Sequence, residues 1–155
     1  MKDFFFIIAV LTVSTTVAQE IGVEQVLTRE ERAQLARETD LKDSLELLIK
    51  FSTARLMTAF LSAEQQQYDS IATNINNYRA ICRYVLEQAT KLRSDKDKKR
   101  VFKKLEQRLR TDLGKLEDLR YNLPQQHCEE LEPLIEDLAL IRDKALSNLF
   151  EGFFE

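Results

Sequence analysis

The stretch from Tyr68 to Leu92 constrains the fold of this 155-residue chain more than any other. Apolar or aromatic side chains recur there at alternating spacings of three and four, and no glycine or proline interrupts them. The positions are Tyr68, Ile71, Ile75, Tyr78, Cys82, Val85, Ala89 and Leu92. A heptad pattern sustained over this length predicts a helix with one buried stripe, which we call the seam. Ile81 and Leu86 widen the stripe, which favours a globular bundle over a two-stranded coiled coil.

The composition indicates that the partners of this helix are also helices. Only 3 glycines and 2 prolines occur, whereas turns and sheets favour glycine, proline and β-branched residues. Apolar residues make up 44% and charged residues 32%, as expected for one folded all-α domain. The formal net charge of -3 argues against bulk affinity for nucleic acid.

The N-terminus has the pattern of a secretory signal peptide. An unbroken apolar run over residues 4–13 is followed by small residues, with Thr16 and Ala18 at positions suited to a cleavage site. Ten apolar residues are too few to span a bilayer, which takes about 20. We expect a signal peptide over residues 1–18, cleavage after Ala18, and a secreted or periplasmic protein that is not transmembrane. The alternative is a retained anchor, because Asp3 weakens the positive start.

The following residues predict an antiparallel, up-down-up-down four-helix bundle over residues 28–150, after a lead-in segment at 19–27. The first helix starts with a capping box at Thr28 and Glu31 and has a possible break at Thr39 and Asp40. Residues 62–67 favour a turn before the seam helix, although the helix could also continue through them. Residues 151–155 form an aromatic tail.

The last two helices have clear boundaries. Ser94 or Asp95 caps the third helix, and the residue before Pro124 is steered away from helix. Gly114 suggests a close helix approach or a slight bend there. Pro133 places the proper start of the fourth helix near residues 128–132.

Two cysteines in an exported chain invite a disulfide, but the expected topology argues against it. Cys82 lies in the middle of the second helix and Cys128 at the start of the fourth, a gap of about 20 Å at 1.5 Å per residue. A disulfide needs Cα atoms within about 7 Å. We therefore expect a buried Cys82 and an unpaired Cys128, with an intermolecular disulfide through Cys128 as the alternative.

Catalytic and metal-binding patterns are missing from the sequence. The single histidine, His127, excludes a di-iron bundle, which needs two Glu-x-x-His pairs. Met57 and His127 fall towards the same bundle end, so a haem-type or small-ligand carrier is the alternative function. We find no phosphate-binding loop, nucleophile elbow or zinc-protease motif, and expect the carboxylates at solvent-facing positions. We expect no enzymatic activity and no cofactor.

Charge is distributed very unevenly along the chain. Residues 91–110 hold ten basic and three acidic residues, a net charge of +7, while residues 117–155 have a net charge of −7. The first interpretation is two solvated helices paired by complementary charge. The second is a docking patch for an acidic protein, an anionic lipid or another envelope polyanion, but not for nucleic acid. The patch comprises Lys96, Lys98, Lys99, Arg100, Lys103, Lys104, Phe153 and Phe154.

Phe153 and Phe154 belong to the aromatic tail, which follows the fourth helix at the basic end. The tail either folds back on residues 21–27 or presents exposed rings to a partner. The sequence therefore predicts a binding or structural module acting through its basic end, with a homodimer also possible.

Overall fold

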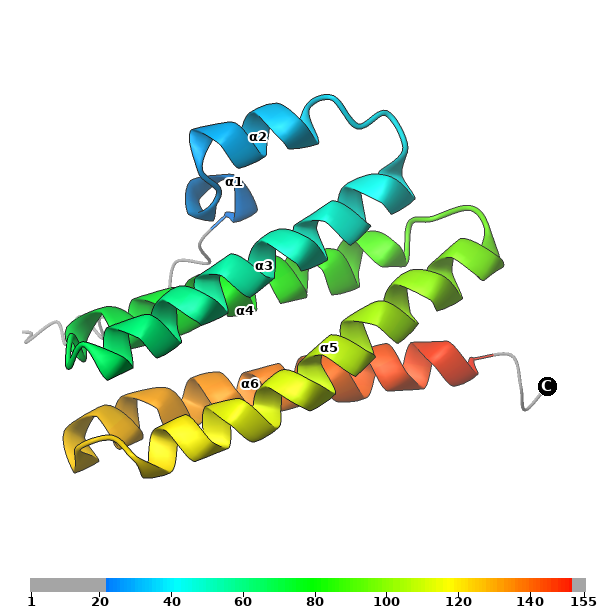
Figure 1. Ribbon diagram of the computed structural model, residues 1–155. Helices are drawn as coiled ribbons and strands as arrows, with labels where there is room; N and C mark the ends of the chain where they lie inside the picture. The colour runs from blue at the N-terminus through cyan, green and yellow to red at the C-terminus, as the bar shows by residue number, and fades with distance from the viewer. Residues whose placement is uncertain (1–21, 152–155) are drawn as a thin grey trace, which may run out of the picture.

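The computed structural model describes residues 22–151, and this part of the chain consists of helices and connecting turns. The described residues form six helices: α1 (Val23–Val26), α2 (Arg29–Leu35), α3 (Leu41–Glu64), α4 (Asp69–Ala89), α5 (Asp95–Tyr121) and α6 (Gln125–Phe150) (Figure 1). The all-α prediction is confirmed for this part of the chain. The predicted signal peptide, residues 1–18, lies outside the described residues, as do Phe153 and Phe154.

The four long helices, α3 to α6, lie side by side as two antiparallel hairpins, α3–α4 and α5–α6 (Figure 1). Neighbours across the hairpins run parallel, with α4 along α6 and α3 along α5. Glu46, near the start of α3, accordingly pairs with Arg100, near the start of α5. The predicted count of four helices over residues 28–150 is not confirmed, because five helices fall in that range and α1 precedes them.

The seam forms the centre of this arrangement. Seven of its eight residues are buried, Tyr68 is half-buried, and the flanking Ile81 and Leu86 are buried as well. α4 accordingly contacts α1, α3, α5 and α6. The seam therefore faces other helices of the same chain, as the heptad pattern predicts.

The helix expected from Thr28 onwards is divided between α2 and α3. Thr28 and Glu31 form the predicted capping box, with reciprocal hydrogen bonds of 3.2 and 2.8 Å. The chain leaves helical geometry after Leu35, and Asp40 Oδ1 accepts a hydrogen bond of 3.2 Å from the Asp43 N–H. Aspartate favours such N-cap positions over helix interiors, so the possible break at Thr39 and Asp40 is the observed boundary.

The turn between α3 and α4 is tight and contains no glycine. The Gln67 N–H donates to the Ser62 carbonyl at 2.8 Å, and the Gln66 N–H donates to the Ala63 carbonyl at 3.0 Å. These two bonds form a Schellman motif, which requires left-handed backbone at its penultimate residue. Gln66 has a φ of 58°, a conformation that glycine adopts more easily. The predicted turn is therefore confirmed.

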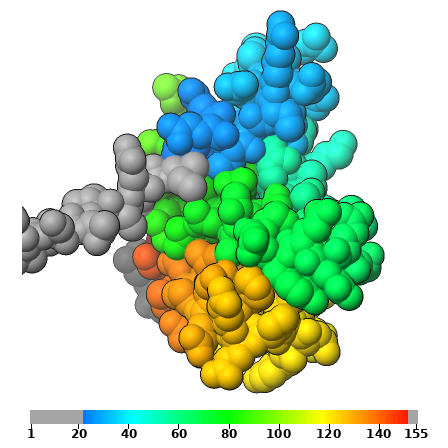
Figure 2. Space-filling view, turned by 90° about the vertical axis from the view of Figure 1, so that its left-hand side faces the viewer, coloured from blue at the N-terminus to red at the C-terminus, as the bar shows by residue number. Residues whose placement is uncertain are grey.

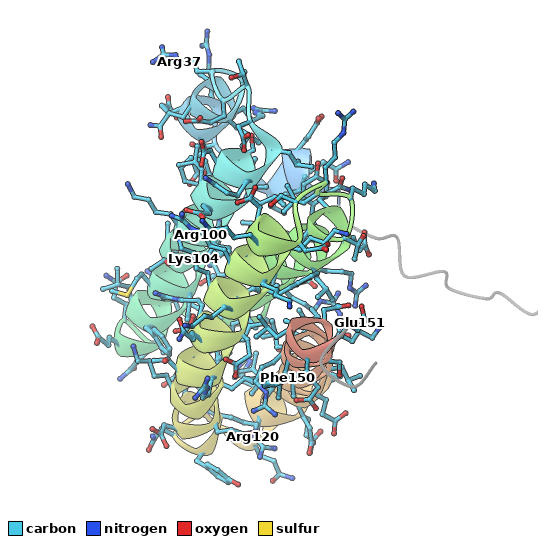
Figure 3. All side chains as sticks on the ribbon, turned by 90° about the vertical axis from the view of Figure 1, so that its right-hand side faces the viewer. Arg37, Arg100, Lys104, Arg120, Phe150 and Glu151 are labelled. Atoms are coloured by element: carbon cyan, nitrogen blue, oxygen red, sulfur yellow. The ribbon has the colours of Figure 1, made fainter. Side chains whose placement is uncertain are left out.

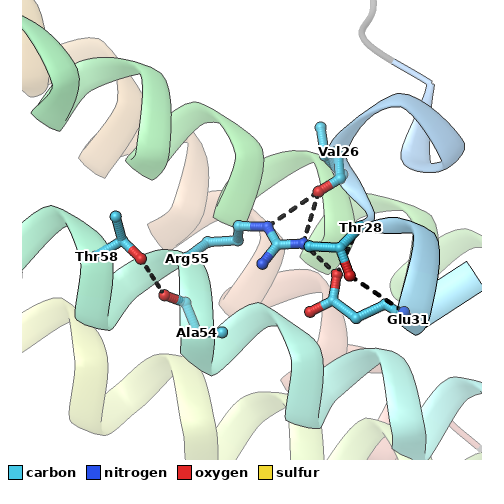
Figure 4. A network of polar contacts seen from close by, with 6 residues as sticks. All are labelled: Val26, Thr28, Glu31, Ala54, Arg55 and Thr58. Carbon is cyan, nitrogen blue, oxygen red and sulfur yellow. Dashed lines mark hydrogen bonds and ion pairs between the residues drawn. The ribbon is translucent and has the colours of Figure 1, made fainter.

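The short helices α1 and α2 form an arm over the α3–α4 hairpin, on the side away from α5 and α6 (Figure 2). Val26 and Leu27 are buried, whereas α2 buries none of its residues. Arg55 of α3 donates two hydrogen bonds to the Val26 carbonyl, at 3.0 and 2.7 Å, and pairs with Glu31 (Figure 4). One guanidinium therefore holds both helices of the arm.

Two of the expected irregularities differ from the structure. Open space surrounds the position where a Cβ would stand on Gly114, and the residue is exposed, so the expected close helix approach is absent at this position. α6 begins at Gln125 and not near residues 128–132, which leaves Pro133 inside the helix. The ring removes one backbone donor, but Pro133 and its potential acceptor residue Glu129 are both exposed.

Candidate functional site

The basic residues predicted as a patch lie along the first half of α5, and the helix divides them between two faces. Lys96, Arg100 and Lys103 are exposed, while Lys98, Lys99 and Lys104 are half-buried. Phe153 and Phe154 lie outside the described residues. The structure thus brings the six cations together on one helix.

One carboxylate of α3 neutralises part of this patch. Glu46 pairs with Arg100 at 2.8 Å and also with Lys104, and its side chain is 18% exposed. Figure 3 shows Arg100 and Lys104 on the side of α5 that faces α3. Lys98 pairs with Asp95 of its own helix at 3.6 Å. Arg100 and Lys104 are consequently structural in part, because they join the two parallel helices.

The outward face of α5 carries a second row of cations, which we call the basic ridge: Lys96, Lys103 and Arg110. These residues recur every seven positions, so they lie on nearly one line about 21 Å long. All three are exposed. Arg110 also forms two hydrogen bonds, of 3.0 and 2.6 Å, with the buried carboxylate of Glu106. The ridge thus combines two exposed lysines of the predicted patch, Lys96 and Lys103, with Arg110, which the prediction did not include.

Charge pairing between α5 and α6 follows only part of the sequence pattern. Arg120, near the end of α5, pairs with Glu132 of α6 at 3.4 Å and with Glu117 at 2.9 Å. The basic first half of α5 instead pairs with α3 through Glu46. Five acidic residues of α6 are exposed, and four of them lie in its first half: Glu129, Glu130, Glu132, Glu136 and, further along, Asp143. The molecule is therefore electrically asymmetric, with the basic ridge at one end and exposed acids towards the other.

A groove runs between α4 and α6 and ends at the start of α5; we call it the C-terminal groove. It consists of two adjoining hollows of about 700 and 350 Å³ that share Thr90, Asn148 and Glu151. Leu86 lines the larger hollow, and Phe102 lines the smaller one together with Lys98 and Lys99. The groove therefore joins a partly apolar floor to two residues of the predicted patch.

Two arginines of α4 bind one carboxylate of α6 beside the larger hollow. Arg79 Nη1 lies 3.0 Å from Asp137 Oδ2, and Arg83 pairs with the same oxygen. Arg83 and Asp137 both line the larger hollow. This cluster joins the two parallel helices as Glu46 joins α3 to α5.

A buried polar cluster crosses the core. The Tyr78 hydroxyl donates a hydrogen bond of 2.8 Å to Asp112 Oδ2, which also accepts one of 2.6 Å from Arg108 Nε. Asp112 is 1% exposed. Burial, together with the neighbouring Cys82 and Asp112, raises the pKa of Tyr78 well above its usual range. This cluster contains a carboxylate and a phenol, but its burial keeps both from an external substrate.

The cysteines are free thiols in different surroundings. Cys82 is buried in the seam, and burial raises the pKa of its thiol to about 12, so it stays protonated and is a poor nucleophile at neutral pH. Cys128 is half-buried, and its Sγ donates hydrogen bonds to the Arg120 and Leu123 carbonyls at 2.9 and 3.3 Å. The single S–H of Cys128 is therefore shared between a carbonyl in the last turn of α5 and one just after the helix.

The two residues considered for haem, Met57 and His127, have different surroundings. The ring of His127 packs against that of Tyr68 in a tilted arrangement, with ring centroids 5.3 Å apart, and its Nδ1 lies 3.4 Å from a Glu130 oxygen. Met57 is 53% exposed on α3. Within residues 22–151, histidine, cysteine and carboxylate side chains form no group of three or more placed to hold a metal ion. The same stretch contains no helix with the length and apolarity needed to cross a membrane.

The sequence interpretation missed the acidic residues that organise the cations. Asp112 and Glu106 are buried, which corrects the expectation that the carboxylates face solvent. Asp112 could have been found, because it continues the three-and-four spacing of Phe102, Leu105 and Leu109 at a position where an apolar residue is expected. Glu46 gives no such local signal, since its partners lie more than 50 positions away.

Comparison of the chain with protein-family models, with curated proteins and with solved structures finds no match.

Proposed function

We propose that this protein is an exported, non-catalytic interaction module that docks on an anionic surface of the cell envelope through the basic ridge. The exposed row of Lys96, Lys103 and Arg110 is the observation that carries the proposal. Helix α5 presents these cations on a convex face, which suits an extended anionic surface better than a small ligand. In this proposal, α3 to α6 serve as an antiparallel four-helix bundle that keeps the ridge straight.

The distribution of acids supports an oriented mode of docking. The exposed glutamates of α6, Glu129 to Glu136, carry negative charge that an anionic surface repels. The ridge and these glutamates act together as a dipole, which turns α5 towards the surface and the acidic end away from it. A net negative protein can therefore bind an anionic surface through one face.

Charge reversal on the ridge tests this function. The double variant Lys96→Glu/Lys103→Glu changes two exposed lysines that form no core contact. Each basic residue near a membrane surface contributes about 1 kcal/mol, so losing two weakens binding by roughly 30-fold. Co-sedimentation with vesicles of about one-third anionic lipid measures this loss, and added salt should weaken wild-type binding as well.

A matched variant separates the ridge from overall charge. Arg32→Glu/Lys115→Glu changes the net charge equally at two exposed positions away from the ridge. We expect this control to retain most of the binding. Equal losses in both variants, or unchanged binding after ridge reversal, would contradict the proposal.

A further inference from the structure

The α5–α6 hairpin carries two rows of opposite charge. It forms the side of the molecule opposite the arm, and we call its surface away from α3 and α4 the outer face (Figure 1). The basic ridge follows α5. On α6, Glu129, Glu136 and Asp143 also recur every seven positions, and all three are exposed; we call them the acidic row. Each row extends over 14 positions, or about 21 Å, so the two rows match in spacing and length.

Both rows lie on the outer face. Arg100 and Lys104 mark the flank of α5 that faces α3, and the basic ridge lies further round the helix, away from that flank. On α6, Glu136 lines a hollow of about 300 Å³ between α5 and α6. The other two members of the acidic row lie on the same line of the helix, because seven residues make nearly two full turns. A molecule that approaches the outer face therefore meets both rows.

The charges of the two rows are not paired with one another. In the described part of the chain, the side chains of Lys96, Lys103 and Glu136 form no ion pair. Arg110 and Asp143 form ion pairs within their own helices. Because α5 and α6 are antiparallel, the first half of α5 lies beside the last half of α6, and the rows are displaced towards opposite ends of the outer face. A row of opposite charge on a second molecule can therefore reach each of them.

We propose that the outer face binds a second copy of this chain. The two copies face each other with their long axes antiparallel, about a two-fold axis at the middle of the outer face. Each basic ridge then lies along the acidic row of the partner copy, and the same contact forms twice. The second copy is the occupant because its outer face has the required opposite charges at the same spacing, and charge complementarity fixes both partner and register.

This pairing covers both basic ridges and therefore opposes the docking proposed above. The inference goes beyond that function and does not depend on it, because the contact involves only the protein itself.

Sedimentation equilibrium over a range of protein concentrations at low salt tests the pairing. We expect the mean mass to rise towards that of two chains, and to return to that of one chain at about 1 M salt, where the screening length is about 3 Å. Lys96→Glu/Lys103→Glu and Glu136→Lys/Asp143→Lys should each weaken self-association by roughly tenfold or more. An equimolar mixture of these two variants should form pairs again, because a mainly acidic outer face then meets a mainly basic one.

Glu30→Lys/Glu38→Lys is the matched control, since it changes the net charge as the acidic-row variant does, at two exposed positions outside the hairpin. It should self-associate as the wild type does. A mean mass of one chain at every concentration, growth beyond two chains, or an equal loss in the control would overturn the proposal.

The vesicle assay separates this inference from the proposed function. Reversal of the acidic row leaves the basic ridge intact, so it should not weaken vesicle binding. A wild type that binds no vesicles would contradict the docking function alone, because the sedimentation result is obtained without vesicles.

Discussion

Tyr78 donates its hydroxyl hydrogen bond to Asp112 across the core, with 2.8 Å between the two oxygens. The bond joins α4 to α5, and Arg108 provides the counter-ion of the same carboxylate. A buried carboxylate retains its negative charge only where donors compensate for lost water. Tyr78 and Arg108 therefore allow an aspartate to occupy a core position of α5.

Tyr78→Phe should destabilise the fold without a change in shape. The phenylalanine ring fits the same space, but Asp112 loses a donor in a site closed to solvent. Hydrogen bonds to charged groups contribute about 1.5–3 kcal/mol, so we expect a loss of about 2 kcal/mol in the free energy of unfolding. Urea denaturation measures it, with Tyr121→Phe as the exposed control. Equal midpoints for Tyr78→Phe and wild type would show that the bond contributes nothing.

Arg55→Ala should release the arm while leaving the four long helices intact. The variant removes both hydrogen bonds to the Val26 carbonyl and the ion pair with Glu31. α2 buries no residue of its own, so few contacts remain to hold it. Hydrogen exchange should accelerate by roughly tenfold or more over residues 23–38 and stay unchanged in α5 and α6.

Arg32→Ala is the control for this prediction, because Arg32 is an exposed arginine of the arm itself. Glu31→Gln separates the two roles of Glu31, since glutamine still closes a capping box but carries no charge for Arg55. If Arg55→Ala accelerated exchange uniformly along the chain, the arginine would support the whole fold and not the arm.

Gln66→Gly should stabilise the protein. The residue lies in left-handed backbone within the Schellman turn, which costs a residue with a Cβ about 1 kcal/mol relative to glycine. Part of this gain is lost, because glycine gives the unfolded chain more freedom. We expect a net increase of about 0.5 kcal/mol in the free energy of unfolding. Gln65→Gly, a change at a neighbouring position with negative φ, should destabilise the protein.

Gly114→Ala should also be stabilising, for the opposite reason. Gly114 lies in the interior of α5, and an added Cβ meets open space. Alanine is favoured over glycine in helix interiors by about 1 kcal/mol. Thermal unfolding should therefore shift upwards by a few degrees. An unchanged or lower midpoint would show that the folded protein does not accommodate a Cβ at this position without cost.

The sequence predicted those features that depend on local chemistry. The seam, the capping box at Thr28, the cap at Ser94 and the helix end before Pro124 each follow from residues within a few positions of one another. The turn over residues 62–67 was also predicted, although it contains no glycine. Local patterns were sufficient for the helical class and for most boundaries.

Contacts between helices that are far apart in the sequence could not be predicted from the sequence. The parallel contact of α3 with α5 depends on how two hairpins pack, and each hairpin alone is compatible with several partners. The neutralisation of Arg100 by Glu46 follows from that packing and not from either helix. The six cations of the predicted patch lie along α5, but which of them are paired and which are exposed could be learned only from the structure.

Cys82 should make the protein less stable at alkaline pH. Burial raises the pKa of its thiol to about 12, whereas an unfolded cysteine ionises near 8.5. Above about pH 8.5 the unfolded state loses a proton that the native state keeps, so the free energy of unfolding falls as pH rises. The fall amounts to at most about 1.4 kcal/mol per pH unit from this thiol, and it ends near pH 12. Below pH 8.5 the thiol contributes no pH dependence.

Urea denaturation of wild type and Cys82→Ala between about pH 7 and 10 checks this slope. Alanine removes the thiol and creates a small cavity, so the variant should be less stable at every pH but should show a shallower decline above pH 8.5. Cys128→Ala is the control for the second cysteine, which is only half-buried. Ionisation of the buried Tyr78 adds to the slope only above about pH 10, where unfolded tyrosine loses its proton. Parallel pH profiles for wild type and Cys82→Ala would show that Cys82 ionises equally in the folded and unfolded chain, and hence that the seam admits water.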